Sequence, residues 1–143
     1  MTERNQFRFF HPLRVRWAEC DAQGIVFNVN YFLYFDVAMT EYMREHNVSF
    51  SGEEALEFYT VRAESNFRDS AVFDDMLDIG VRCQRIGTTS LTYAFGIFRR
   101  DVLLNEGSLT YVHAMQGTKE KAPLPQHFID RLSAYETLAP EKS

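Results

Sequence analysis

The sequence is poor in cysteine: it contains only Cys20 and Cys83, which lie far apart in the chain. Zinc sites of the common kinds need cysteines or histidines in closely spaced pairs, and disulfide-rich scaffolds need many more cysteines. The sequence therefore predicts no disulfide and no metal site. Two free thiols are typical of a reducing compartment, so we expect a cytoplasmic protein.

The sequence also lacks an excess of positive charge and long apolar runs. The formal net charge is −5, so no basic field is available to attract a nucleic-acid backbone, and we expect no nucleic-acid partner. No apolar run approaches the ~20 residues of a membrane span, and the N-terminus has no signal-peptide pattern. Without repeats or linkers, residues 1–143 are predicted to form a single domain, with loose tails at 1–6 and 139–143.

Familiar catalytic signatures are absent as well. The sequence contains no G-x-S-x-G nucleophile elbow, no P-loop, no G-x-G-x-x-G dinucleotide motif and no H-E-x-x-H zinc motif. Any chemistry must therefore come from a simpler arrangement of side chains.

Aromatic residues, in contrast, are abundant, with 13 Phe and 7 Tyr among 143 residues. Alternating or continuous apolar segments of strand length predict five strands. One buried helix is predicted between the first and second strands, where polar residues recur only every fourth position, and a short helix follows the last strand. The predicted strands span residues 7–17, 58–67, 76–85, 90–99 and 102–115, and the helices cover residues 28–47 and 123–136. This order favours an α+β fold in which an antiparallel sheet of about five strands wraps around one long central helix.

The segment between the first strand and the long helix is the best candidate for chemistry. Asp21 lies there, followed by Gly24, which can adopt a positive φ, and by Asn28 or Asn30, either of which can cap the helix. A helix N-terminus carries a partial positive charge and unpaired N–H groups that can stabilise an oxyanion. A carboxylate beside it can attack a carbonyl or activate water.

This segment resembles the signature of the 4-hydroxybenzoyl-CoA thioesterase-like hotdog family. The resemblance rests on the stretch VRWAECDAQGIVFNVNYFLYF, in which Asp21 matches the catalytic carboxylate of the family. The backbone N–H near Asn28 matches the oxyanion donor, and Tyr31 matches the aromatic residue that opens the helix. The resemblance continues to about residue 128, with matches at Ser90 and Gly107.

The resemblance implies hydrolysis of an acyl-CoA thioester to a free acid and coenzyme A. No cofactor is implied, because coenzyme A is part of the substrate. Family members form dimers or tetramers with acyl sites between chains, so we expect a homodimer or homotetramer. Asp21 of one subunit should then face strand residues of another, chiefly Thr60 and Glu64.

The phosphates of coenzyme A need cationic or hydroxyl partners. Arginines and hydroxyl residues gather around the turn between the third and fourth predicted strands, and the candidates are Arg85, Thr88, Thr89 and Ser90.

Several alternatives remain open. Cys20 could supply a thiol nucleophile and Glu19 an auxiliary base, although Glu19 is expected to be a solvated neighbour. A helix carboxylate, Asp36 or Glu41, could replace the loop aspartate. A hotdog dehydratase would need a histidine on the helix, and the stretch from Asn28 to Glu45 contains none.

A hotdog protein that binds acyl-CoA or acyl-carrier protein without turnover is the non-enzymatic alternative. The acyl group, aromatic or aliphatic, is not determined by the sequence, nor are the thioester carrier and the choice between dimer and tetramer.

Overall fold

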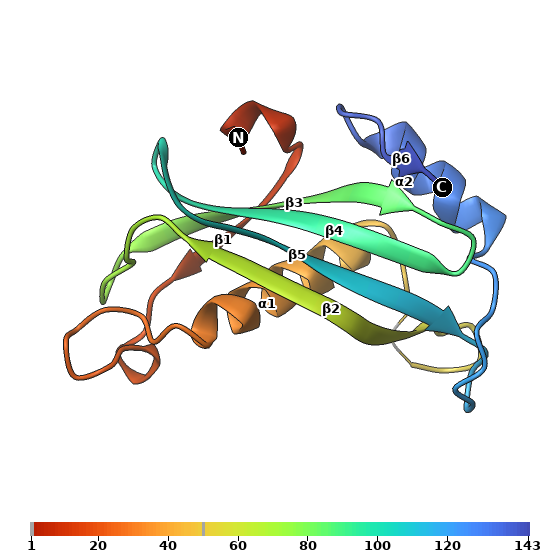
Figure 1. Cartoon of the computed structure of the whole chain (residues 1–143), viewed down its shortest axis with the longest axis horizontal. Coiled ribbons are helices and arrows are strands. Elements are labelled where there is room, and N and C mark those ends of the chain that lie inside the picture. The colour runs from red at the N-terminus through yellow and green to blue at the C-terminus, as the bar shows by residue number, and fades with distance from the viewer. Residues whose placement is uncertain (1, 50) are drawn as a thin grey trace.

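The fold is an antiparallel sheet that curves around one long helix (Figure 1). The computed structural model describes residues 2–49 and 51–143. The main strands are β1 (Phe9–Arg14), β2 (Glu57–Phe67), β3 (Met76–Ile86), β4 (Ser90–Arg99) and β5 (Val102–Ala114), and they are arranged in the order β1-β3-β4-β5-β2. Helix α1 (Asn30–Glu45) lies against one face of this sheet. The predicted α+β fold is confirmed.

Large side chains fill the space between α1 and the sheet. Tyr34, Phe35 and Tyr42 of the helix are fully buried, and the Phe35 ring stacks on Phe95 of β4 with centroids 4.6 Å apart. The prediction that the helix is covered on most of its surface is only partly correct, because Leu33 remains 45% exposed. Among the helices of residues 2–49 and 51–143, none is long and apolar enough to cross a membrane.

The first strand is shorter than the predicted 7–17 segment. β1 ends at Arg14, and a short 3-10 turn (Trp17–Glu19) follows it. The backbone N–H of Arg16 donates to the Glu19 carboxylate at 2.9 Å instead of to a neighbouring strand. This side-chain acceptor turns the chain away from the sheet and toward α1.

Described residues near each end of the chain contact the sheet, which corrects the prediction of loose tails at 1–6 and 139–143. Arg4 forms an ion pair with Asp78 of β3 at 2.6 Å. After helix α2 (Gln126–Tyr135), the short strand β6 (Glu141–Lys142) pairs in parallel with the end of β3. Met1 lies outside the described residues, and the single domain predicted for residues 1–143 stays a prediction.

Candidate active site

Asp21 lies in a tight turn between the 3-10 segment and α1. Its Oδ1 accepts a hydrogen bond from the Gln23 N–H at 2.8 Å, and its carbonyl accepts one from the Gly24 N–H at 3.0 Å. Gly24 has a φ of +79°, which is the left-handed conformation that glycine tolerates best. Because only Oδ1 has a partner among the described residues, Oδ2 of this half-buried carboxylate can approach a ligand.

The segment that follows Asp21 is hydrogen-bonded to a second loop, residues 69–75. Val26 donates its N–H to the Ala71 carbonyl at 2.9 Å, and Ile25 forms an isolated antiparallel bridge with Val72. The position of Asp21 is thus determined by the 69–75 segment as well as by its own turn.

Glu19 is the residue beside Asp21 that sequence reasoning misjudged. It is buried, not a solvated neighbour, and its carboxylate binds the Arg16 guanidinium and accepts the Tyr34 hydroxyl at 2.9 Å. Its carbonyl accepts the Phe27 N–H and the Asn30 side-chain amide. The sequence did contain a signal of this pairing. Arg16 lies three residues before Glu19, and this spacing allows the two side chains to meet in one turn.

The hydrogen bonds around Glu19 keep it charged. Burial by itself raises the pKa of this carboxyl, but the hydrogen bonds from Arg16 and Tyr34 outweigh it and hold the pKa below its usual value. In turn, burial and the bond to Glu19 raise the pKa of the Tyr34 hydroxyl. A charged Glu19, paired with Arg16, therefore lies two residues before Asp21.

The start of α1 presents free backbone donors near this turn. The N–H groups of Asn30, Tyr31 and Phe32 donate to carbonyls three residues earlier in the chain. For the N–H groups of Asn28 and Val29, no acceptor is found among the described residues. Both residues are exposed, so these two N–H groups are the ones that a ligand oxygen can reach.

The predicted caps are wrong. The N-cap residue is Val29 and makes no side-chain capping bond, so neither Asn28 nor Asn30 fills this role. The Asn30 side chain donates instead to the Glu19 carbonyl at 2.8 Å. The amide thus joins the helix start to the segment that carries Asp21.

Tyr31 is a core residue. It is only 2% exposed, its hydroxyl accepts the Ala71 N–H at 3.0 Å, and its ring meets Phe67 edge-on at 5.4 Å. In the single chain it supports the Asp21 loop from below and has no open surface for an acyl group.

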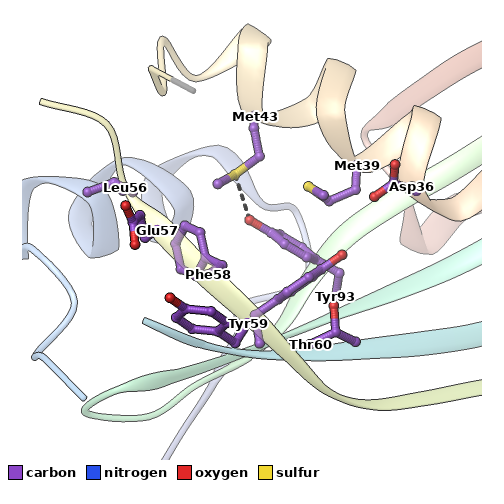
Figure 2. Close-up of a pocket in the computed structure, with 10 residues that line it drawn as sticks. Asp36, Met39, Met43, Leu56, Glu57, Phe58, Tyr59, Thr60 and Tyr93 are labelled. Atoms are coloured by element: carbon purple, nitrogen blue, oxygen red, sulfur yellow. Dashed lines mark hydrogen bonds between the residues drawn. The ribbon is translucent and has the colours of Figure 1, made fainter. Parts of the chain in front are cut away.

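A hollow of about 440 Å³ lies between α1 and the first half of β2 (Figure 2). Asp36, Met39 and Met43 reach into it from the helix, and Tyr93 and Tyr111 form its floor. The Tyr93 hydroxyl contacts the Met43 sulfur at 2.7 Å. Burial and, after it, the nearby Asp36 charge raise the pKa of Tyr111. The volume of the hollow lies within the range of small-molecule sites.

We call this hollow the helix-strand pocket. The residues that line it are Asp36, Met39, Met43, Leu56, Glu57, Phe58, Tyr59, Thr60, Tyr93 and Tyr111.

One chain does not bring Asp21 and Thr60 together. The Phe67 end of β2 lies beside Tyr31, at the start of α1. Thr60 is seven residues from Phe67 on the same strand, or about 20 Å away at the usual rise per residue. Figure 1 likewise places the loop before α1 and the beginning of β2 toward opposite ends of the molecule.

The predicted phosphate-binding residues fall on different surfaces. Arg85 and Ser90 line a hollow on the sheet face turned away from α1, together with Glu64. Glu64 is paired there with Arg62. Thr88 lines a separate hollow beside α2, and the carbonyl of Thr89 accepts the His113 N–H.

The remaining candidates gain little support from the geometry. Burial is the main reason that the pKa of the Cys20 thiol is raised, so its thiolate is disfavoured. Glu41 is paired with Arg44 on the surface of α1. Asp36 lines the helix-strand pocket and remains the only alternative carboxylate among these candidates that faces a cavity.

Comparison with known proteins identifies the relatives of this chain. The sequence model of the thioesterase superfamily matches residues 23–105. The acyl-CoA thioester hydrolase YbgC of Escherichia coli is 30% identical over 111 residues, which cover 76% of this chain and 83% of that protein. The match to the family model begins just after Asp21, so it does not itself include that residue.

Solved structures agree with the sequence matches. The PA5185 protein of Pseudomonas aeruginosa superposes with a TM-score of 0.86 at 26% identity, covering 96% of this chain and 97% of the other. The Synechocystis protein Slr0204, a 1,4-dihydroxy-2-naphthoyl-CoA thioesterase, has the same fold, with a TM-score of 0.79 at 19% identity over 87% and 94% of the two chains. The sheet wrapped around α1, the family model and these neighbours together establish that this chain belongs to the thioesterase superfamily, with a hotdog fold.

Proposed function

We propose that the protein hydrolyses an acyl-CoA thioester to a free acid and coenzyme A, with Asp21 as the catalytic carboxylate. The observation that carries this proposal is one hydrogen-bonded segment that contains both a half-buried carboxylate and two free N–H groups at the start of α1. The similarity to an acyl-CoA thioester hydrolase of Escherichia coli supports the choice of substrate.

The chemistry follows from these two groups. The thioester carbonyl oxygen accepts hydrogen bonds from the N–H groups of Asn28 and Val29, which stabilise the oxyanion as the carbonyl is attacked. If Asp21 acts as general base, it takes a proton from water, the hydroxide adds to the carbonyl carbon, and the proton then passes to the departing thiolate. If Asp21 attacks directly, an acyl anhydride forms, coenzyme A leaves, and water cleaves the anhydride.

We further propose that the complete site contains two chains. β2 is an edge strand, and most of its residues are exposed. If two copies pair antiparallel along β2 about its midpoint, residues 57–60 of one copy lie beside residues 64–67 of the other. The Thr60 end of one helix-strand pocket then adjoins the start of α1 of the partner, where Asp21 and the free N–H groups are located.

Asp21→Asn tests the reaction. A thiol-release assay on aliphatic and aromatic acyl-CoAs should show turnover by the native protein and a loss of about 100-fold or more in the variant, because general acid-base catalysis contributes on that order. Asp101→Asn, in the exposed hairpin between β4 and β5, is the matched control and should keep native turnover.

Two results would contradict the assignment. Native turnover in Asp21→Asn would show that this carboxylate is not catalytic. Thioester binding in calorimetry without turnover of any member of the panel would favour a non-catalytic protein that binds acyl-CoA or acyl-carrier protein.

A further inference from the structure

A second hollow adjoins the helix-strand pocket at the end of α1. It has a volume of about 690 Å³ and lies beneath the segment that joins α1 to β2. Its apolar lining includes Val48, Ala55 and Phe128. Among the described residues, Leu56 alone lines both hollows, so this residue lies at the boundary between them.

The helix-strand pocket extends along α1. From Asp36 to Met43 it follows seven residues of α1, or about 10 Å at the usual helical rise. Figure 2 shows Leu56 at one end and Asp36 at the other, with the two methionines between them. A ligand that enters at the polar Thr60 and Asp36 end therefore points its far end at Leu56.

The lining suits a flexible chain. Met39, Met43 and Leu56 supply unbranched or aliphatic surface, and methionine adapts its shape to what it contacts. Tyr93 and Tyr111 add aromatic surface to the lining. An aliphatic acyl chain that lies along α1 would contact these groups over its whole length.

Leu56 itself is held in place. It is half-buried against the core, and the carboxylate of the next residue, Glu57, accepts the Gly117 N–H at 3.0 Å. Two residues further on, Phe58 packs against Phe128 and His113. These contacts anchor the start of β2, directly after Leu56, to the rest of the protein.

We propose that Leu56 closes the acyl pocket and thereby sets the longest aliphatic chain that the protein accepts. This proposal rests on the proposed hydrolysis of acyl-CoA, and it names the substrates as aliphatic acyl-CoAs whose chains end at Leu56. Longer chains are excluded by this wall at Leu56, although the second hollow behind it has space for them.

The test compares Leu56→Ala, which removes most of the blocking side chain, with Leu56→Trp, which enlarges it. For butanoyl-, octanoyl- and palmitoyl-CoA, kcat/KM is measured by thiol release. The palmitoyl-to-butanoyl ratio should rise roughly tenfold or more in Leu56→Ala, because hydrophobic pockets discriminate by about this factor per methylene. Leu56→Trp should lower the octanoyl-to-butanoyl ratio.

Leu138→Ala is the matched control, since this partly exposed leucine follows α2 and lines neither hollow. It should leave every ratio unchanged. Circular dichroism establishes that each variant is folded. An unchanged chain-length profile in both folded Leu56 variants would overturn the proposal.

A binding measurement separates this proposal from the proposed reaction. S-alkyl-CoA thioethers of the same chain lengths cannot be hydrolysed, and calorimetry gives their Kd for each variant. If Leu56→Ala shifts the preference toward longer chains while no thioester is turned over, the wall is supported and the hydrolase assignment fails. If turnover depends on Asp21 but neither Leu56 variant changes the profile, the hydrolase assignment stands and the wall is wrong.

Discussion

Glu19 joins the candidate catalytic loop to the interior of the protein. Its side chain binds Arg16 and Tyr34, and its carbonyl binds both Phe27 and Asn30. Removing the charge therefore weakens a network that spans the strand end, the loop and the start of α1. The stability of the protein and the position of Asp21 therefore both depend on Glu19.

Glu19→Gln should lower the free energy of unfolding by about 1–3 kcal/mol at pH 7, the usual range for hydrogen bonds to a charged group. Urea unfolding at a series of pH values measures the effect. The folded pKa of Glu19 is depressed, so its contribution is fully present above the ordinary value of 4.5 and is lost as the pH falls through the folded pKa. The difference between native protein and variant should therefore shrink in acid.

Glu41→Gln is the control for this change. Glu41 forms an exposed ion pair with Arg44, and such pairs contribute at most about 1 kcal/mol. Equal destabilisation by the two substitutions, or a Glu19 effect that persists unchanged below the folded pKa, would show that the buried ion pair is not the cause.

At the scale of single residues, the sequence identified candidate groups but not their surroundings. Asp21 was selected from its place between a strand and a helix, and the structure holds it in a tight turn there. The burial of Glu19 and the pairing of Asn30 were missed, because both depend on which groups the fold brings together. A single sequence shows that a residue is charged or polar, but not what it contacts.

The contact between α1 and β5 is unusually close at Gly107. A Cβ atom at this position would lie 2.7 Å from Cε2 of Phe35 and would also collide with the Glu64 carbonyl of β2. Gly107 thus allows the Phe35 ring to lie directly on the strand. The helix can then stack this ring on Phe95.

Gly107→Ala should therefore destabilise the protein by about 1–3 kcal/mol, the usual cost of overpacking a core. Thermal or urea unfolding measures this, with Ser108→Ala on the same strand as the control. Phe35→Leu removes the ring edge, so in the double variant part of the loss caused by Gly107→Ala should be recovered. Additive effects of the two substitutions would show that the Phe35 ring is not a source of this strain.

Most elements were predictable because their signals are local. Alternation and short turns located the strands of the meander, and the four-residue polar repeat located α1. The tails were predicted wrongly for a non-local reason: the end of the chain, Glu141, pairs with Arg85, more than fifty residues earlier. The sequence of a two-residue strand contains no pattern that predicts its pairing partner.

The molecule as a whole presents an open edge at β2. Val61 lies near the middle of this strand, at the irregularity between Thr60 and Arg62, and is 59% exposed. Unpaired edge strands are prone to pair with other chains unless they are protected. The proposed two-chain site uses this edge.

Val61→Asp should dissociate the proposed dimer, since it would place two carboxylates close together across the two-fold axis. Sedimentation equilibrium measures the mass, and the thiol-release assay measures activity on the same samples. Val102→Asp, at a comparably exposed position on the β4–β5 hairpin, should change neither. A native protein that is a fully active monomer would contradict the two-chain site.

The strand order also bears on how the chain folds during synthesis. Within the described residues β2 pairs with β5 alone, although β3 and β4 lie between them in sequence. The helix emerges from the ribosome long before the strand that completes its cover. Its aromatic face, with Phe35 at the centre, is therefore only partly covered until β5 is available, although β4 already supplies Phe95, and we expect the wrapped core to be completed late in translation.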